Sequence, residues 1–143
     1  MYSTTLAISL TAVLLLAAAP SAPEPEHITI QHVLIGFKGS VPGKSITRTQ
    51  EEAKALAEDI LARAKKGENF DELVKKYTND SAPGIYSMAN NGVAPAGEGE
   101  YARNRMVPAF GDAGFPLKVG EIGMASYDSA KSPYGWHIVK RLK

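Results

Sequence analysis

The sequence predicts an α+β domain in which helices cover a four-stranded sheet, antiparallel or mixed. Alternating apolar residues at 28–37 and 134–140 mark one strand near each end of the domain. Between them, residues 49–77 repeat apolar side chains at helical spacing. The remaining residues add a short strand, a short helix and one further strand. Strands that flank a helical block in this order are typical of the α+β class.

Each of the two end strands carries one histidine, His32 in the first and His137 in the last. Both faces of the first strand are largely apolar, so it is expected at the centre of the sheet, covered on both sides. Two such strands can lie in one sheet and bring the histidines together as a central pair. Taken singly, each histidine is more simply explained as an ordinary hydrogen-bonded strand residue.

Local signals mark where the predicted helices begin. Thr49 opens a capping box with the glutamate three residues further on, in which each residue's side chain accepts the other's backbone N–H. Asn69 begins a second, shorter helix, and Pro108 suits the first position of a third. Met106 and Phe110 are four residues apart and can share one face there. Alone, this pair indicates only core packing.

Composition excludes several classes of function. The chain has 143 residues, room for one domain, and a formal net charge of +1. That charge predicts no bulk attraction to nucleic acid or to anionic membranes. There is no cysteine, which excludes disulfides, thiol catalysis and zinc–cysteine sites. His27 and His32 lie on opposite faces of a strand and cannot share a metal, so no metal or other cofactor is expected.

Residues 1–21 are predicted to be a secretory signal peptide. Residues 6–19 are almost entirely apolar and small residues follow, with cleavage expected after Ser21. An uncleaved membrane anchor is the alternative, although about 14 apolar residues fall short of the ~20 that span a bilayer. Residues 22–27 then form a linker, and residues 28–143 form the domain. The protein is accordingly expected to be exported, periplasmic or extracellular, without a stable membrane span.

Five segments spread over residues 30–142 form a recognisable series. They are Gln31-His32-Val33-Leu34-Ile35, Gly67-Glu68-Asn69-Phe70-Asp71-Glu72-Leu73, Met106-Val107-Pro108-Ala109-Phe110, Leu117-Lys118-Val119-Gly120-Glu121-Ile122 and Tyr134-Gly135-Trp136-His137-Ile138-Val139. In this order they resemble the parvulin family of peptidyl-prolyl cis-trans isomerases, also called the PpiC or rotamase domain. One match alone is weak, whereas five in the right order are specific.

The resemblance implies a βα3βαβ2 fold with a four-stranded antiparallel sheet covered by helices. It places His32 and His137 side by side on the floor of an active site. Asp80 matches the position that this family fills with cysteine or aspartate, where it tunes the histidine pair electrostatically. Met106 and Phe110 match the positions that form the proline pocket. The catalytic residues implied are therefore the two histidines and the aspartate.

Two further positions follow from the resemblance. Ser132 matches a Ser/Thr position near the histidine pair and is assigned to substrate binding. The family's Gly-x-Leu-Gly segment, which supplies another wall of the pocket, is displaced because residues 81–105 are longer here and different. One alignment puts Tyr86 in that wall and another puts Glu98 there; we prefer Tyr86, because a carboxylate makes a poor wall for proline. The added residues are either a specificity loop or a tolerated surface loop.

The expected function is isomerisation of X-Pro bonds in exported proteins during folding, by a non-covalent mechanism. The barrier of about 20 kcal/mol comes from amide resonance, and an apolar socket around the proline ring can favour the twisted amide that has lost this resonance. The alternative is a parvulin-like chaperone that grips extended segments with little isomerase activity. The expected partners are proline-containing unfolded or folding polypeptides, bound by a monomer, and no nucleic acid.

Overall fold

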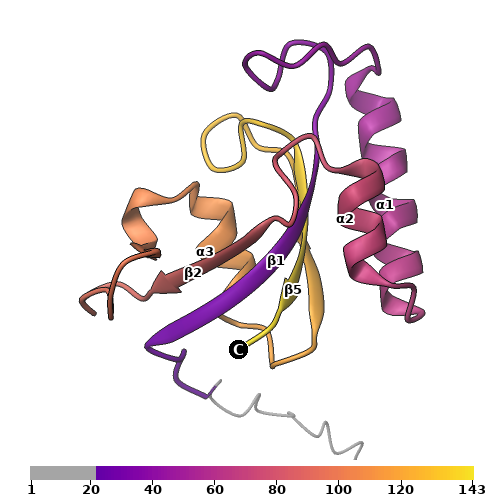
Figure 1. Ribbon diagram of the computed structural model, residues 1–143. Coiled ribbons are helices and arrows are strands. Elements are labelled where there is room, and N and C mark those ends of the chain that lie inside the picture. Colours follow the sequence, from indigo (N-terminus) through magenta and orange to yellow (C-terminus); the bar gives the residue numbers. More distant parts are fainter. Residues whose placement is uncertain (1–21) are drawn as a thin grey trace, which may run out of the picture.

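The computed structural model describes residues 22–143, which form an α+β domain with five strands and three α-helices (Figure 1). The predicted signal peptide, residues 1–21, lies outside the described residues. In chain order the elements are β1 (His27–Ile35), α1 (Gln50–Lys65), α2 (Phe70–Tyr77), β2 (Ile85–Ala89), β3 (Glu100–Ala102), α3 (Pro108–Gly114), β4 (Ile122–Ala125) and β5 (Trp136–Arg141). A single 3₁₀ turn, Arg103–Arg105, connects β3 to the segment before α3.

The sheet corrects the prediction of four antiparallel strands, because it has five strands in the order β3-β2-β1-β5-β4 and is mixed. β1 pairs antiparallel with β2 and β5, and β4 pairs antiparallel with β5. The added strand, β3, pairs in parallel with β2. It arises in the segment that the sequence predicts as a surface excursion. A strand of three residues among glycines and prolines has too few alternations to be seen in the sequence.

The helical region also differs from the implied topology, because two helices rather than three lie between β1 and β2. α1 begins as predicted: Thr49 Oγ1 accepts from the Glu52 N–H at 3.1 Å, and Glu52 accepts from the Thr49 N–H at 2.7 Å. α2 begins after Asn69, whose side chain caps it. Residues 78–84 form turns instead of a third helix. This segment ends at Gly84, whose φ of +67° is outside the helical region.

Both faces of β1 are buried, as expected of a central strand. α1 and α2 lie against one face, which carries Val33 and Ile35, and α3 lies against the other, which carries Ile30 (Figure 1). Because side chains alternate along a strand, His32 shares the α3 face with Ile30. His137 occupies the same face of the neighbouring strand β5. The fold therefore leaves both histidines under α3, away from the α1–α2 layer.

Residues 22–26, most of the predicted linker, are tied to the domain beside the loop that follows β2. The Arg103 guanidinium donates to Glu24 at 2.7 Å and to the side-chain oxygen of Asn90 at 2.9 Å. The Asn90 amide donates to the backbone carbonyl of Pro25 at 3.0 Å. Within the described part of the chain, no helix combines the length and apolar character needed to cross a membrane.

Candidate active site

Strand pairing brings the two histidines together. The register of β1 against β5 sets His32 opposite Val139 and Leu34 opposite His137, so the histidines are diagonal neighbours on one face. Their Nδ1 atoms are 3.1 Å apart, and the ring planes are inclined by only 20°. Each residue is 1% exposed. The pair is therefore a buried floor on which other groups of the α3 face can form a site.

A carboxylate and a phenol extend the network from His32. Asp80, in the turn after α2, accepts at Oδ2 from His32 Nε2 at 2.9 Å and from the Tyr86 hydroxyl at 2.7 Å. These bonds, that from His32 foremost, hold the pKa of Asp80 well below its usual value. Burial, together with the neighbouring carboxylate, raises the pKa of Tyr86 above its usual value. Asp80 is therefore an ionised acceptor, and Tyr86 is a neutral donor.

The ionised carboxylate determines the hydrogen positions along the network. Because a carboxylate only accepts, His32 carries a proton on Nε2 and donates it to Asp80. If His137 then donates from Nδ1 to His32 Nδ1, only a lone pair remains on His137 Nε2, an atom buried without a hydrogen-bond partner among residues 22–143. A buried lone pair is tolerated better than a buried unpaired N–H, which favours this arrangement. Burial lowers the pKa of His137 to about 3, so its ring is neutral.

A cavity of about 270 Å³ opens beside this network. Phe110, from α3, stands edge-on to both imidazoles, with ring centroids 4.6 Å from His32 and 5.0 Å from His137. The Tyr86 ring lies 5.4 Å from that of Phe110 and forms a second aromatic wall. The other lining residues are Leu34, Val41, Pro42, Asp80, Met106, Val107 and Tyr134. The cavity is thus mostly apolar, and the hydrogen-bonded network with the ionised Asp80 carboxylate lies at one side of it.

The structure brings most of the predicted site residues to this cavity. Its lining includes His32, Asp80, His137, Met106, Phe110 and Tyr86. Ser132 is not part of the lining: it is 1% exposed, and its hydroxyl donates to the carbonyl oxygen of Gly135 at 2.7 Å. Glu98, the alternative to Tyr86, is exposed and lies outside the lining as well. Of the two alignments, the one through Tyr86 agrees with this geometry.

A family model described as the PPIC-type PPIase domain matches residues 15–143. The chain belongs to the parvulin family. This confirms the family predicted from the five sequence segments.

Two solved structures have a similar fold. Their sequence identities to this chain are low, so they support the fold and not the function. The peptidyl-prolyl isomerase ESS1 from Candida albicans has a TM-score of 0.61 and 23% identity, covering 82% of this chain and 63% of its own. TbPIN1 has a TM-score of 0.58 and 22% identity, covering 82% and 98%.

Longer curated proteins contain similar sequences. Foldase protein PrsA of Geobacillus sp. (strain WCH70) is 39% identical over 120 residues, which are 84% of this chain and 39% of that protein. Chaperone SurA of Pseudomonas fluorescens (strain Pf-5) is 29% identical over 117 residues, which are 82% of this chain and 23% of that protein. This parvulin domain therefore spans only a minor part of the length of these relatives.

Five lining residues of the candidate site are not predicted from the sequence: Leu34 and Val107, which lie within two residues of predicted site residues, and three residues from two loops. Val41 and Pro42 come from the loop between β1 and α1, and Tyr134 comes from the loop before β5. The Ser40 hydroxyl joins the two loops by donating to the Tyr134 carbonyl at 2.9 Å. The apolar pair Val41-Pro42 within a polar, lysine-containing loop was the only available signal. Contacts between loops leave no periodic pattern, so this rim could not be assembled from the sequence.

Gly84 allows the start of β2 to approach His32 closely. Its carbonyl accepts from the His32 N–H at 2.9 Å. A Cβ added at Gly84 would lie 2.7 Å from the His32 carbonyl oxygen and 3.3 Å from its ring carbon Cδ2. The positive φ of Gly84 is a second reason for glycine at this position. Tyr86 follows two residues further on, and its ring centroid lies 5.4 Å from that of His32.

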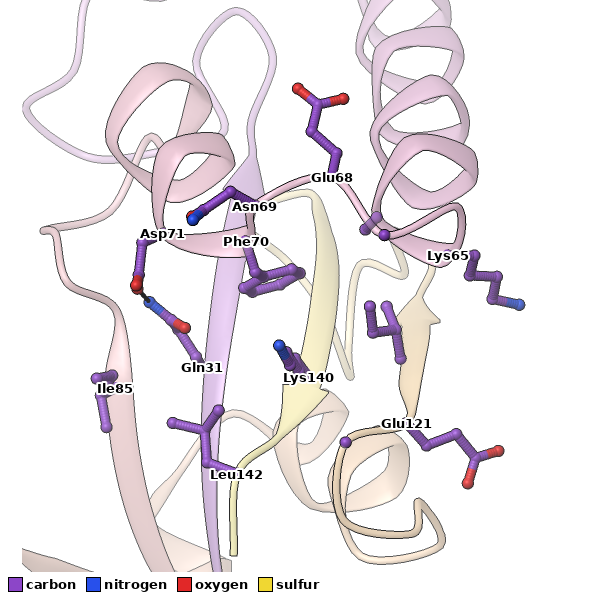
Figure 2. A pocket seen from close by; sticks show the side chains of 14 residues that line it. Gln31, Lys65, Glu68, Asn69, Phe70, Asp71, Ile85, Glu121, Lys140 and Leu142 are labelled. Carbon is purple, nitrogen blue, oxygen red and sulfur yellow. Dashed lines mark hydrogen bonds between the residues drawn. The ribbon is translucent and has the colours of Figure 1, made fainter.

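A larger hollow of about 940 Å³ lies on the opposite face of the sheet, beside α2 and the end of α1 (Figure 2). Two of its polar side chains bond within the domain: the Gln31 amide donates to Asp71 at 2.7 Å and to the Pro83 carbonyl at 2.9 Å. The Lys140 ammonium lies 5.9 Å from the centre of the Phe70 ring. None of its lining residues within 22–143 is a histidine. The smaller, more apolar cavity is therefore the candidate active site.

Replacing Tyr86 by phenylalanine is expected to lower the free energy of unfolding by about 1.5 kcal/mol, because a hydrogen bond to a charged group is lost. We take the lower end of the range for such bonds, because Tyr86 is partly exposed. The ring wall would remain while Asp80 loses a donor. Urea unfolding at neutral pH measures the change. Tyr101→Phe is the matched control, since the Tyr101 hydroxyl makes no hydrogen bond within the described residues. Equal stability of the two variants would contradict the network.

Proposed function

We propose that this parvulin domain is a peptidyl-prolyl cis-trans isomerase that acts on X-Pro bonds of exported proteins during folding. The observation that carries the proposal is the apolar cavity beside the His32–His137 pair. Its volume of about 270 Å³ is slightly below the ~300–1,000 Å³ typical of pockets for drug-sized ligands. A cavity of this size suits one proline ring with the backbone on either side of it.

The proposed socket for the proline ring consists of Phe110, Tyr86 and Met106, which line the cavity. The barrier to rotation, about 20 kcal/mol, arises from amide resonance. In the twisted transition state this resonance is lost, and the amide oxygen is less polar. An apolar socket that holds the ring through the rotation binds this state better than either planar isomer, which is what lowers a barrier.

The proposed catalytic residues are His32, His137 and Asp80, which line the cavity where the X-Pro amide would lie. Asp80 carries the charge of the network, and the donors His32 and Tyr86 fix its position. Isomerisation breaks no covalent bond, so neither a nucleophile nor a leaving group is required. For Ser132 we propose a positioning role in place of the substrate contact expected from the sequence. Its bond to the Gly135 carbonyl orders the chain just before His137.

The second candidate is a chaperone that grips extended segments with little isomerase activity. It is favoured by the relatives, one of which is named a chaperone and the other a foldase. Both candidates use the same cavity and the same polypeptide partners, namely unfolded or folding chains that contain proline. We propose that these partners are met outside the cytoplasm, after export directed by residues 1–21, and that the domain acts as a monomer.

The test compares a protein substrate with a small one. The purified chain is added to a protein whose refolding is limited by prolyl isomerisation, and separately to an Ala-Pro tetrapeptide. An isomerase accelerates both reactions, which take about 10–100 s without a catalyst. A chaperone suppresses aggregation of the protein and leaves the tetrapeptide rate unchanged. If the folded chain neither accelerates the tetrapeptide nor binds unfolded protein, both candidates are wrong.

A further inference from the structure

Residues 81–105, which the sequence predicts to be longer than the matching segment of the family, contain β3, which pairs with β2 at the edge of the sheet. β3 pairs with β2 so that Tyr101 lies opposite Met88. Met88 and Tyr86 are two residues apart on β2 and therefore occupy the same face of the sheet. Met88 is fully buried on that face, in the apolar cluster that contains Phe110. Tyr101 is thus at the edge of the sheet on the side of the cavity.

Three aromatic rings run from the cavity to this edge. Phe110 lies within the cavity, the Tyr86 ring is 5.4 Å from it, and the Tyr101 ring is 6.4 Å from that of Tyr86. Exposure rises along the row, from 5% at Phe110 to 47% at Tyr101. We call these three residues the aromatic ledge. It continues the apolar surface of the cavity out to solvent.

The charged groups beside Tyr101 are engaged within the domain. Glu100 accepts from the His27 ring at 3.0 Å, and Arg103 is paired with Glu24 at 2.7 Å and with Asp112 at 3.2 Å. Because these charges already have partners, the exposed feature of β3 that can recognise a ligand is the Tyr101 ring. Aromatic rings prefer other rings at centroid separations of about 4.5–7 Å, in offset or edge-on arrangements.

We propose that the aromatic ledge binds a large apolar side chain, best an aromatic one, that flanks the proline of the substrate. This inference rests on the proposed function, because it takes the proline ring to lie against Phe110. The two ring separations place Tyr101 at most about 12 Å from Phe110. Three extended residues span about 10–11 Å, and the length of the recognised side chain covers the remainder. The recognised side chain therefore lies within three residues of the proline. The added strand is in this view a specificity element.

The experiment uses a panel of Ala-Pro peptides in which phenylalanine replaces alanine at each of the three positions before and after the proline. For the full chain, at least one position is expected to raise kcat/KM and affinity by about two- to tenfold, the range of an aromatic pair. Tyr101→Ala should bring this ratio close to one, and Tyr101→Phe should preserve it. Ile85→Ala is the matched control: Ile85 is 46% exposed but lines the hollow on the opposite face, and its ratio should not change.

The outcomes separate this inference from the proposed function. If phenylalanine gives no gain at any position, or if the gain persists in Tyr101→Ala, the ledge is not a binding element. If no peptide is isomerised while NMR titration shows tighter binding of a phenylalanine peptide that depends on Tyr101, the isomerase proposal fails and the ledge stands. Because each ratio compares two peptides on the same protein, partial unfolding of a variant cancels.

Discussion

Replacing Phe110 by alanine is expected to lower kcat/KM for X-Pro isomerisation by at least about tenfold, which corresponds to 1.4 kcal/mol of lost transition-state stabilisation. The ring is in edge-on contact with both His32 and His137, and it is the element of the cavity that joins the apolar socket to the polar network. Removing a buried phenylalanine ring costs about 3–5 kcal/mol in packing. This packing cost lowers the stability of the fold and is separate from the loss of contact with the twisted substrate, so the two effects must be measured separately.

The matched control is Phe115→Ala. Phe115 belongs to the same apolar cluster as Phe110 and is buried to a similar degree, but it does not line the cavity. The two variants should lose comparable stability, while only Phe110→Ala loses activity per folded molecule. Circular dichroism at the assay temperature measures the folded fraction, and Phe110→Leu replaces the alanine variant if that fraction is low. Equal activity losses at both positions would show that Phe110 acts only through the core.

The histidine pair could be predicted from the sequence because two strong local patterns coincide with it. The residues of β1 are apolar on both faces of the strand, which indicates a central position in the sheet. The residues of β5 also show the two-residue period of a strand. Helix starts at Thr49 and Asn69 depend on side chains within four residues, so they too are visible locally. Antiparallel pairing of β1 with β5 then leaves few ways to bring His32 and His137 to the same face.

The parts that the sequence did not predict depend on contacts between distant, irregular segments. β3 is too short for its alternation to be recognised, and only its pairing with β2 makes it a strand. The rim formed by Val41 and Tyr134 depends on two loops that meet across the end of the sheet. Ser132 was placed in the site by resemblance, whereas its hydroxyl is used by the Gly135 carbonyl of its own loop. Loop geometry depends on contacts between distant parts of the chain, and local residue patterns in the sequence do not predict these contacts.

The free energy of unfolding is expected to fall steeply as the pH drops from about 6.5 towards 3, because His137 is buried as a neutral ring. Its pKa is lowered from 6.5 to about 3 in the folded state, first by burial and then by His32. In this window the unfolded chain binds a proton at His137 that the folded chain does not bind. Acid therefore favours unfolding, with a slope of up to about 1.4 kcal/mol per pH unit for this group.

Urea unfolding at half-unit steps between pH 7 and pH 4 measures the slope, and His137→Gln supplies the comparison. This variant is expected to be less stable at neutral pH, because it replaces a buried ring. It is also expected to lose less stability on acidification, because glutamine does not titrate. The pKa of Asp80 is also lowered, from 3.8, and its contribution is lost in the same direction but only at lower pH. Identical slopes above pH 4 would mean that His137 takes up its proton while folded. Nε2 of His137 would then carry this proton and would need a hydrogen-bond acceptor, and the neutral state inferred for the His137 ring would be wrong.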